Sequence, residues 1–188
     1  MNPDLVVVLD ACVLVPAALR DTLLRFAEEP RLYIPRWSDE IISEMVRTLE
    51  SAIGLAPEKT TYLVSELKKH FDDAWVLAYE PLLSILTNDP KDRHVLAAAV
   101  RCGAEVIVTY NRRHFPQSAV EPWGIEVQAP STFLKHQFEL NPEIVTDKLH
   151  AQAENLGRSL SELLKVLKRA VPGFVAVFAN ELGIDLKE

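Results

Sequence analysis

Three carboxylates and one amide stand out in the sequence because their positions could bring them together. Asp10 comes directly after an apolar run, and Asn111 follows a second apolar run later in the chain. Asp92 lies in the first turn of an expected helix, and Glu44 lies on the helix that follows the second expected strand. In parallel α/β proteins, ligands bind at the carboxyl ends of the strands. We therefore expect these four side chains to meet at that edge of a sheet.

Such a set of side chains suits a hard divalent cation. Carboxylate and amide oxygens are ligands for Mg²⁺ or Mn²⁺, whereas zinc would favour His or Cys. A magnesium site typically uses one or two carboxylates plus several waters, and it leaves room for a substrate phosphate. One or two ions of this kind can activate a water and stabilise the leaving oxygen of a phosphodiester. The predicted chemistry is therefore metal-dependent hydrolysis of phosphodiester bonds.

The elements that must position these residues follow an α/β pattern. Residues 5–9 form a continuous apolar run, which is typical of a parallel strand buried on both faces. Strands and helices then alternate, which predicts a three-layer α/β/α domain with a central parallel sheet and right-handed crossovers. The expected strands are 5–9, 31–35, 75–79, 105–109 and 125–127, and the expected helices include 12–29, one that begins after Ser38, 57–73, 90–102 and 131–138.

The last part of the chain has a different pattern. From residue 141 onward only helices are expected, so we predict two units, an α/β domain at 1–140 and a helical C-terminal extension at 141–188. Ser159 and Glu162 form a capping-box pattern at the start of one of these helices. The apolar faces around Leu164 and Phe178 could complete the core of the monomer or form a dimer surface.

Composition narrows the class of protein further. The 188 residues carry a formal net charge of -7, which argues against a protein that coats nucleic acid by bulk electrostatics. An enzyme that acts on nucleic acid through an acidic metal site is compatible with that charge. No apolar run is long enough to span a membrane, and the first residues lack the positive start of a signal peptide, so we expect a cytoplasmic protein. Cys12 and Cys102 are expected to be buried thiols within apolar helical patterns.

Taken in order, these motifs resemble the PIN-domain ribonucleases, and most of all the VapC-like toxins of toxin–antitoxin pairs. The matching motifs are the strand that ends at Asp10, the helical sequence 43–45, the sequence Asp-Arg-His-Val-Leu-Ala-Ala-Ala at 92–99 and the strand at 106–111 with the basic residues after it. The resemblance covers about residues 4–135. It implies cleavage of RNA with a divalent metal ion, a product with a 5′ phosphate, a cognate antitoxin protein as partner and, in many relatives, a homodimer.

The resemblance also assigns roles by position. Asp10, Glu44 and Asp92 match the three acidic metal-binding residues, and they are expected to be catalytic together with Asn111. Many relatives have a fourth acid where this chain has Asn111. A neutral amide could hold a water or bind a second ion weakly, so the number of metal ions stays open. No function is carried over to the C-terminal helices.

Several residues have an ordinary structural explanation as well. Glu40 lies four residues before Glu44 on the same helical face and is its main rival, while Asp89 is best explained as a helix N-cap. His94 is expected to pack locally and not to bind metal. Arg112 and Arg113 could contact substrate phosphate or form a solvated turn. The three tryptophans could stack on bases, but we expect them to pack in the core or at an interface, and they are Trp37, Trp75 and Trp123.

Two other functions compete with the nuclease. The chain could be a catalytically weak protein- or RNA-binding module that acts through its helical tail, as the neutral Asn111 and the acidic net charge would allow. A phosphatase on a related sheet is disfavoured. Enzymes of that kind that form an aspartyl-phosphate use a second acid two residues after the first, and here that position is Cys12.

Overall fold

The central element is a sheet of four parallel strands. The computed structural model describes residues 4–186. The strands follow the spatial order β2-β1-β3-β4, which puts the two apolar strands β1 and β3 in the middle. Their bounds are β1 Val6–Leu9, β2 Ile34–Arg36, β3 Val106–Val108 and β4 Glu126–Gln128.

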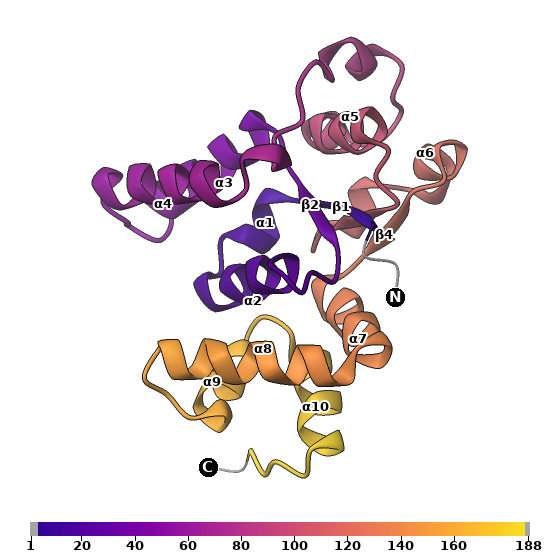
Figure 1. Cartoon of the computed structure of the whole chain (residues 1–188). Helices are drawn as coiled ribbons and strands as arrows, with labels where there is room; N and C mark the ends of the chain where they lie inside the picture. The colour runs from indigo at the N-terminus through magenta and orange to yellow at the C-terminus, as the bar shows by residue number, and fades with distance from the viewer. Residues whose placement is uncertain (1–3, 187–188) are drawn as a thin grey trace.

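Helices cover the sheet on both sides, as the alternation of elements predicted. Helix α5 lies on one side and helices α1 and α2 on the other (Figure 1), which confirms the three-layer α/β/α architecture. The alanines of α5 at positions 97–99 are fully buried, and their small side chains let the helix lie close to the sheet. The helices are α1 Ala11–Leu14, α2 Ala17–Ala27, α3 Asp39–Ser51, α4 Pro57–His70, α5 Arg93–Cys102, α6 Gln117–Val120, α7 Pro130–Leu140, α8 Pro142–Asn155, α9 Leu160–Leu167 and α10 Pro172–Glu181.

The prediction of one helix over 12–29 is wrong, because the chain breaks at Pro16. Proline has no N–H for a helical hydrogen bond, and Pro16 takes an extended conformation with ψ 113°. Two shorter helices result, α1 and α2. The guanidinium of Arg20 donates to the main-chain oxygens of Leu14 at 2.6 Å and Val15 at 3.3 Å. These bonds satisfy carbonyls that the break leaves without helical partners.

The second strand starts later than predicted and runs through a proline. β2 begins at Ile34, not at residue 31, and Pro35 lies inside it. Ile34 donates its N–H to the oxygen of Leu5 at 2.8 Å, so the next residue points away from β1. Because β2 is an edge strand, the missing N–H of Pro35 breaks no ladder hydrogen bond.

The strand predicted over 75–79 does not form, and the helix predicted before it is shorter than expected. Only an isolated bridge between Trp37 and Trp75 forms there. Ala78 then takes a positive φ of 58°, which ends any extended run. The helix predicted over 57–73 ends at His70.

The predicted helix boundaries at Ser38 and Gly103 are confirmed. The Ser38 side chain accepts from the N–H of Ile41, and Gly103 ends α5 in the left-handed conformation that glycine adopts without steric cost. Asp89 caps a short 3₁₀ turn, Pro90–Asp92, by accepting from the N–H of Lys91 at 3.0 Å. Helix α5 then starts at Arg93, so Asp92 lies just before it and not in its first turn.

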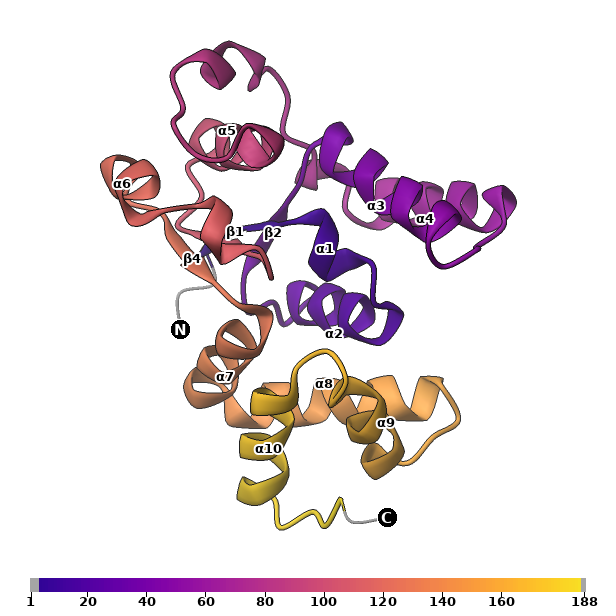
Figure 2. The ribbon, with the colours of Figure 1, turned by 180° about the vertical axis from the view of Figure 1, so that it is seen from behind.

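The C-terminal helices pack on one another and on the α/β layers. Figure 2 shows α7 to α10 gathered below α2. Leu164 and Phe178 are fully buried within this chain, so their faces complete its own core. The predicted capping box of Ser159 and Glu162 is present at α9. The division into two units at residue 140 stays a prediction.

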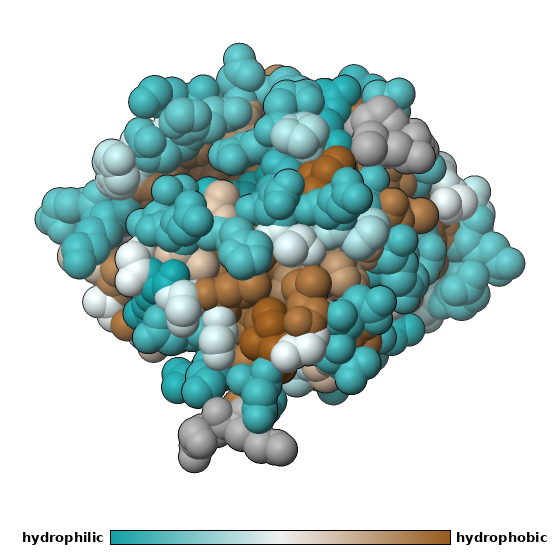
Figure 3. Space-filling view, turned by 60° about the horizontal axis from the view of Figure 1, so that its bottom comes forward, coloured by the Kyte–Doolittle hydropathy of each residue, from teal (hydrophilic) through white to brown (hydrophobic). Residues whose placement is uncertain are grey.

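Part of the surface of these helices is apolar. The end of the molecule that carries α8, α9 and α10 shows apolar side chains among polar ones (Figure 3). Leu156, Val177 and Leu182 are exposed large apolar residues of this region. Among the described residues, no helix is both long and apolar enough to cross a membrane.

Buried polar contacts join α8 to α2. Gln152 is fully buried, donates to the oxygen of Ala18 at 3.0 Å and accepts from the hydroxyl of Thr22 at 2.8 Å. Lys148, one turn earlier, donates to the oxygens of Arg25 and Glu28 at the end of α2, at 2.7 and 2.9 Å. The C-terminal helices are therefore attached by hydrogen bonds as well as by apolar packing.

Replacing Gln152 by leucine should lower the free energy of unfolding by about 1–3 kcal/mol, because both hydrogen bonds are lost in a buried place. Urea unfolding followed by circular dichroism measures this change. The matched control is Glu154→Gln on the exposed side of the same helix, which should change stability by no more than about 0.5 kcal/mol. Equal stability of the Gln152→Leu variant and the wild type would contradict this account of the attachment.

Candidate active site

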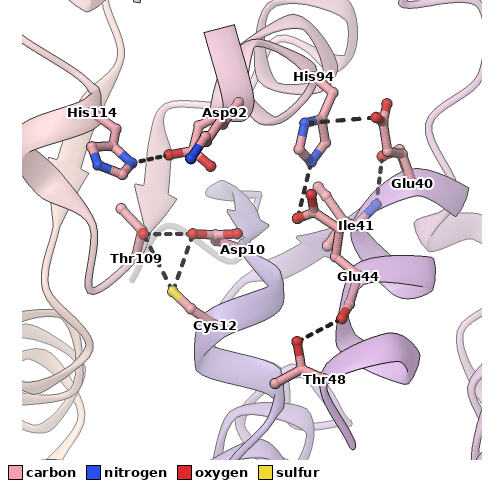
Figure 4. Close-up of polar contacts among 12 residues, drawn as sticks. Asp10, Cys12, Glu40, Ile41, Glu44, Thr48, Asp92, His94, Thr109 and His114 are labelled. Carbon is pink, nitrogen blue, oxygen red and sulfur yellow. Dashed lines mark hydrogen bonds and ion pairs between the residues drawn. The ribbon is translucent and has the colours of Figure 1, made fainter. Parts of the chain in front are cut away.

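The four residues singled out in the sequence line one cavity. Its volume is about 390 Å³, and it lies where β1 ends and α1, α3 and α5 approach. Figure 4 shows the carboxylates of Asp10, Asp92 and Glu44 around the same space. The lining consists of Asp10, Ala11, Cys12, Val15, Glu44, Arg47, Thr48, Asp92 and Asn111.

Asp10 is held in place from the neighbouring strand. Its N–H donates to the oxygen of Val108 at 3.1 Å, which extends the parallel pairing of β1 with β3 by one residue. The hydroxyl of Thr109 donates to Asp10 Oδ2 at 2.6 Å, and the thiol of Cys12 donates to the same oxygen at 3.1 Å. Among residues 4–186, no hydrogen bond reaches the other carboxylate oxygen, Oδ1. Asp10 is 3% exposed, so this fixed carboxylate lies at the bottom of the cavity.

Cys12 belongs to the site, which the sequence did not indicate. The prediction of a buried core thiol is only half right, because the residue is partly buried and lines the cavity. Burial and the negative charge of Asp10 raise the pKa of the Cys12 thiol to about 12. The group therefore stays protonated and acts as a hydrogen-bond donor. Cys102 is likewise a free, partly buried thiol, away from the cavity.

Asp92 is held by a histidine from the segment after β3. Its Oδ2 forms a hydrogen bond with Nδ1 of His114 (Figure 4). The main-chain oxygen of Asp92 accepts from the side-chain amide of Asn88 at 3.1 Å. In the described part of the chain, Oδ1 of Asp92 has no hydrogen-bond partner. Asp92 and Asp10 thus share one arrangement, in which one carboxylate oxygen is held and the other is free.

Glu44 reaches the cavity from α3 and faces a buried histidine. Nε2 of His94 lies 3.4 Å from Glu44 Oε2, and His94 is only 4% exposed. The two groups are close but not hydrogen-bonded, because Nε2 of His94 has no partner that meets hydrogen-bond geometry within residues 4–186. His94 therefore packs locally, as predicted, but it does so against a site residue.

Glu40, the rival of Glu44, lies outside the cavity lining. Its carboxylate accepts from the hydroxyl of Tyr79 at 3.1 Å and lies 4.0 Å from Nδ1 of His94. The ring of His94 therefore separates the two glutamates, with one nitrogen facing each (Figure 4). The structure brings Glu44, and not Glu40, to the other acids.

Asn111 completes the cavity from the segment after β3. Its N–H donates to the hydroxyl of Thr109 at 2.9 Å, so Thr109 contacts both Asn111 and Asp10. The hydroxyl of Tyr110, between them, donates to the oxygen of Ala170 at 3.0 Å, in the connection between α9 and α10. The C-terminal helices therefore contact the segment that carries Asn111.

Arg112 and Arg113 line a different cavity. It has a volume of about 740 Å³ and also includes Glu121 and Glu126 in its lining, so positive and negative side chains balance there. The arginine at the carboxylate cavity is Arg47, one turn after Glu44 on α3.

The tryptophans differ in their surroundings. Trp37 is fully buried and packs edge-to-face against Trp75 and Phe71, with ring centroids 5.4 and 5.8 Å apart. The indole N–H of Trp75 donates to Asp39. Trp123 is 39% exposed. Packing therefore accounts for Trp37 and Trp75, as predicted.

The charges of the cavity suit a cation. Burial raises the pKa of Glu44 above its ordinary value, and His94 opposes this shift. The negative charges of Asp10, Asp92 and Glu40 raise it further. Carboxylates that repel one another in this way are stabilised by a positive ion between them. The oxygen donors favour Mg²⁺ or Mn²⁺.

The acids do not form a complete cage. Within residues 4–186, no set of three or more His, Cys, Asp and Glu side chains lies so that it could hold an ion by itself. Proteins usually bind Mg²⁺ through one or two carboxylates together with several waters.

Sequence reasoning missed Thr109, His114, Cys12 and Arg47 as members of the site. Only Arg47 had a signal of its own, the spacing of three residues that puts it on the same helical face as Glu44. Thr109 and His114 act across the sheet or between loops, and their positions in the chain differ from those of their bonded partners by 99 and 22. No local pattern reports such pairs.

Comparisons with known proteins agree with this fold. The family model described as "PIN domain" matches residues 6–113, a segment that contains all four predicted site residues. A protein of Mycobacterium tuberculosis named "Putative ribonuclease VapC50" is 49% identical over 70 residues, which is 37% of this chain and 41% of that protein. The match thus spans less than half the length of that relative. No solved structure shows a significant match. The chain therefore belongs to the PIN domain family, as its motifs had indicated.

Proposed function

We propose that this protein is a Mg²⁺- or Mn²⁺-dependent endoribonuclease that hydrolyses RNA phosphodiester bonds. The observation that carries the proposal is that Asp10, Glu44, Asp92 and Asn111 line the same cavity. Membership of the PIN family and the ribonuclease name of the mycobacterial relative support it.

The side chains have complementary roles in this proposal. Asp10 and Asp92 each offer the carboxylate oxygen that lacks a protein partner among the described residues, and Glu44 adds a third negative charge. When bound, a divalent ion activates a water for attack on phosphorus and stabilises the leaving oxygen. Asn111 holds a water or a substrate oxygen through its amide. Arg47, at the rim, attracts the substrate phosphate.

The biological setting is part of the same proposal. We infer that the protein is the toxin of a type II toxin–antitoxin pair, acts in the cytoplasm and is inhibited by a cognate antitoxin protein. A homodimer is the assembly we expect. The VapC name of the relative supports this setting, and the partner and the RNA that is cut are open to experiment.

Changing Asp10 to asparagine should abolish RNA cleavage, because the variant removes a negative charge from the cavity floor while keeping the size of the side chain. Cleavage of a mixed-sequence single-stranded RNA with added Mg²⁺ or Mn²⁺ measures this, with EDTA as the metal-free control. Circular dichroism should show an intact fold. Unchanged cleavage by the purified variant would reject the assignment.

If the wild type cleaves no RNA under these conditions but binds the product of a neighbouring gene tightly, the alternative of a catalytically weak binding module is favoured. The neutral Asn111, where many relatives carry an acid, is the feature of the site that fits this alternative.

The two glutamates of α3 should differ sharply. Glu44→Gln should lower cleavage more than about tenfold, since even outer partners of metal ligands usually contribute that much. Glu40→Gln, on the other side of His94, is the matched control and should retain most of the activity. Mn²⁺-dependent rises in melting temperature give a second measurement of the same difference. A larger loss from Glu40→Gln than from Glu44→Gln would show that the wrong glutamate has been assigned.

A further inference from the structure

The segment after β3 contributes a histidine to the site that no sequence motif assigned. His114 lies on the 3₁₀ turn η4, Arg112–His114, and its ring is partly buried against Asp92. Asp89 N–H donates to the His114 oxygen at 3.1 Å, so the two segments are joined through the main chain as well. Two hydrogen bonds therefore join the segment that carries His114 to the segment that carries Asp89 and Asp92.

The proton of this ring can be placed from its neighbours. Nε of Arg113 lies 3.3 Å from Nε2 of His114, and an arginine nitrogen can only donate. Nε2 is therefore the acceptor, which leaves the proton of a neutral ring on Nδ1. That proton is donated to Oδ2 of Asp92. One hydrogen-bond chain thus runs from Arg113 through His114 to Asp92.

His114 restrains the carboxylate of Asp92 in the same way that Thr109 and Cys12 restrain the carboxylate of Asp10. Thr109 and Cys12 occupy Oδ2 of Asp10, and His114 occupies Oδ2 of Asp92. In Figure 4 the second oxygen of Asp92 points away from His114. A carboxylate fixed in this way presents one defined oxygen to a cation and loses little rotational freedom when it binds.

We propose that His114 is a positioning residue, which orients Asp92 for metal binding by donating from Nδ1, with Arg113 fixing the tautomer. This inference rests on the proposed metal-dependent nuclease function. In this proposal His114 supports the metal site indirectly, through its hydrogen bond to Asp92, and does not contact the ion. Arg113 also has a role in the site although its side chain lines the neighbouring cavity.

Three substitutions separate the donated hydrogen bond from the bulk of the ring. His114→Asn puts an amide N–H near the position of Nδ1, His114→Gln puts it near Nε2, and His114→Phe keeps a ring without any donor. Mn²⁺ titrations followed by electron paramagnetic resonance measure affinity without cleavage. We expect the Phe and Gln variants to bind Mn²⁺ about 10- to 100-fold more weakly, and Asn to restore binding to within a few-fold of the wild type. Wild-type affinity in His114→Phe, or equal weakness in His114→Asn and His114→Phe, would overturn the proposal.

A metal-free measurement tests the geometry directly and separates it from the proposed function. Side-chain ¹⁵N NMR spectra of the wild type should show His114 as the Nδ1-protonated tautomer, and Arg113→Ala should reduce that preference. The Nε2-protonated tautomer in the wild type would reject the positioning role whether or not the protein cleaves RNA. The expected tautomer together with no Mn²⁺ binding by the wild type would instead reject the nuclease, and with it the purpose assigned to the contact.

Discussion

The parallel pairing of β1 with β3 is the constraint on which the site depends. In this register Leu9 lies beside Val108, so the residues that follow the two strands emerge side by side. Asp10 then receives a hydrogen bond from Thr109, and Thr109 in turn accepts from the N–H of Asn111. A shift of one residue would send these side chains to the opposite face of the sheet. The apolar runs that bury β1 and β3 therefore also set the geometry of the acidic cavity.

Each acid is then stabilised by a different kind of neighbour. Asp10 has a hydroxyl and a thiol, Asp92 has the ring of His114, and Glu44 faces the buried ring of His94. Burying a carboxylate without such partners would cost several kcal/mol. These contacts occupy only part of each acid, so the negative potential of the cavity is kept. A cation fits this arrangement better than a neutral ligand does.

The helices after residue 140 belong to the architecture that supports the site. Gln152 and Lys148 join α8 to α2, the helix that follows the Asp10 segment. Burial raises the pKa of Tyr110 to about 12, so its hydroxyl stays protonated and donates to Ala170. The C-terminal helices therefore support both chain segments that lead to the cavity. Apolar residues of these helices that do not pack against the rest of the chain, such as Val177, are exposed at the surface.

The sequence by itself determined the fold class and the main members of the cavity. One buried strand ends in Asp10 and a second is followed by Asn111. The geometry of parallel sheets then places both residues at the same edge of the sheet. Helix signals at Ser38 and Gly103 were equally reliable, because caps are local chemistry. The sequence patterns predicted element bounds less well where the backbone departs from regular geometry. Pro16 breaks the helix predicted over 12–29, and the positive φ of Ala78 interrupts the strand predicted over 75–79.

The spacing of Glu40 and Glu44 puts both on one helical face, and although the family resemblance favoured Glu44, only the tertiary structure shows which of them α3 turns toward the cavity. It also decided the partners of each acid, because His114 and Thr109 reach their carboxylates from distant segments. The tertiary structure also shows that Arg112 and Arg113 line another cavity and that Arg47 lines the cavity of the acids. The physical reason is the same in each case. Sequence spacing fixes which residues share an element, while packing fixes the rotation of that element and therefore what its side chains meet.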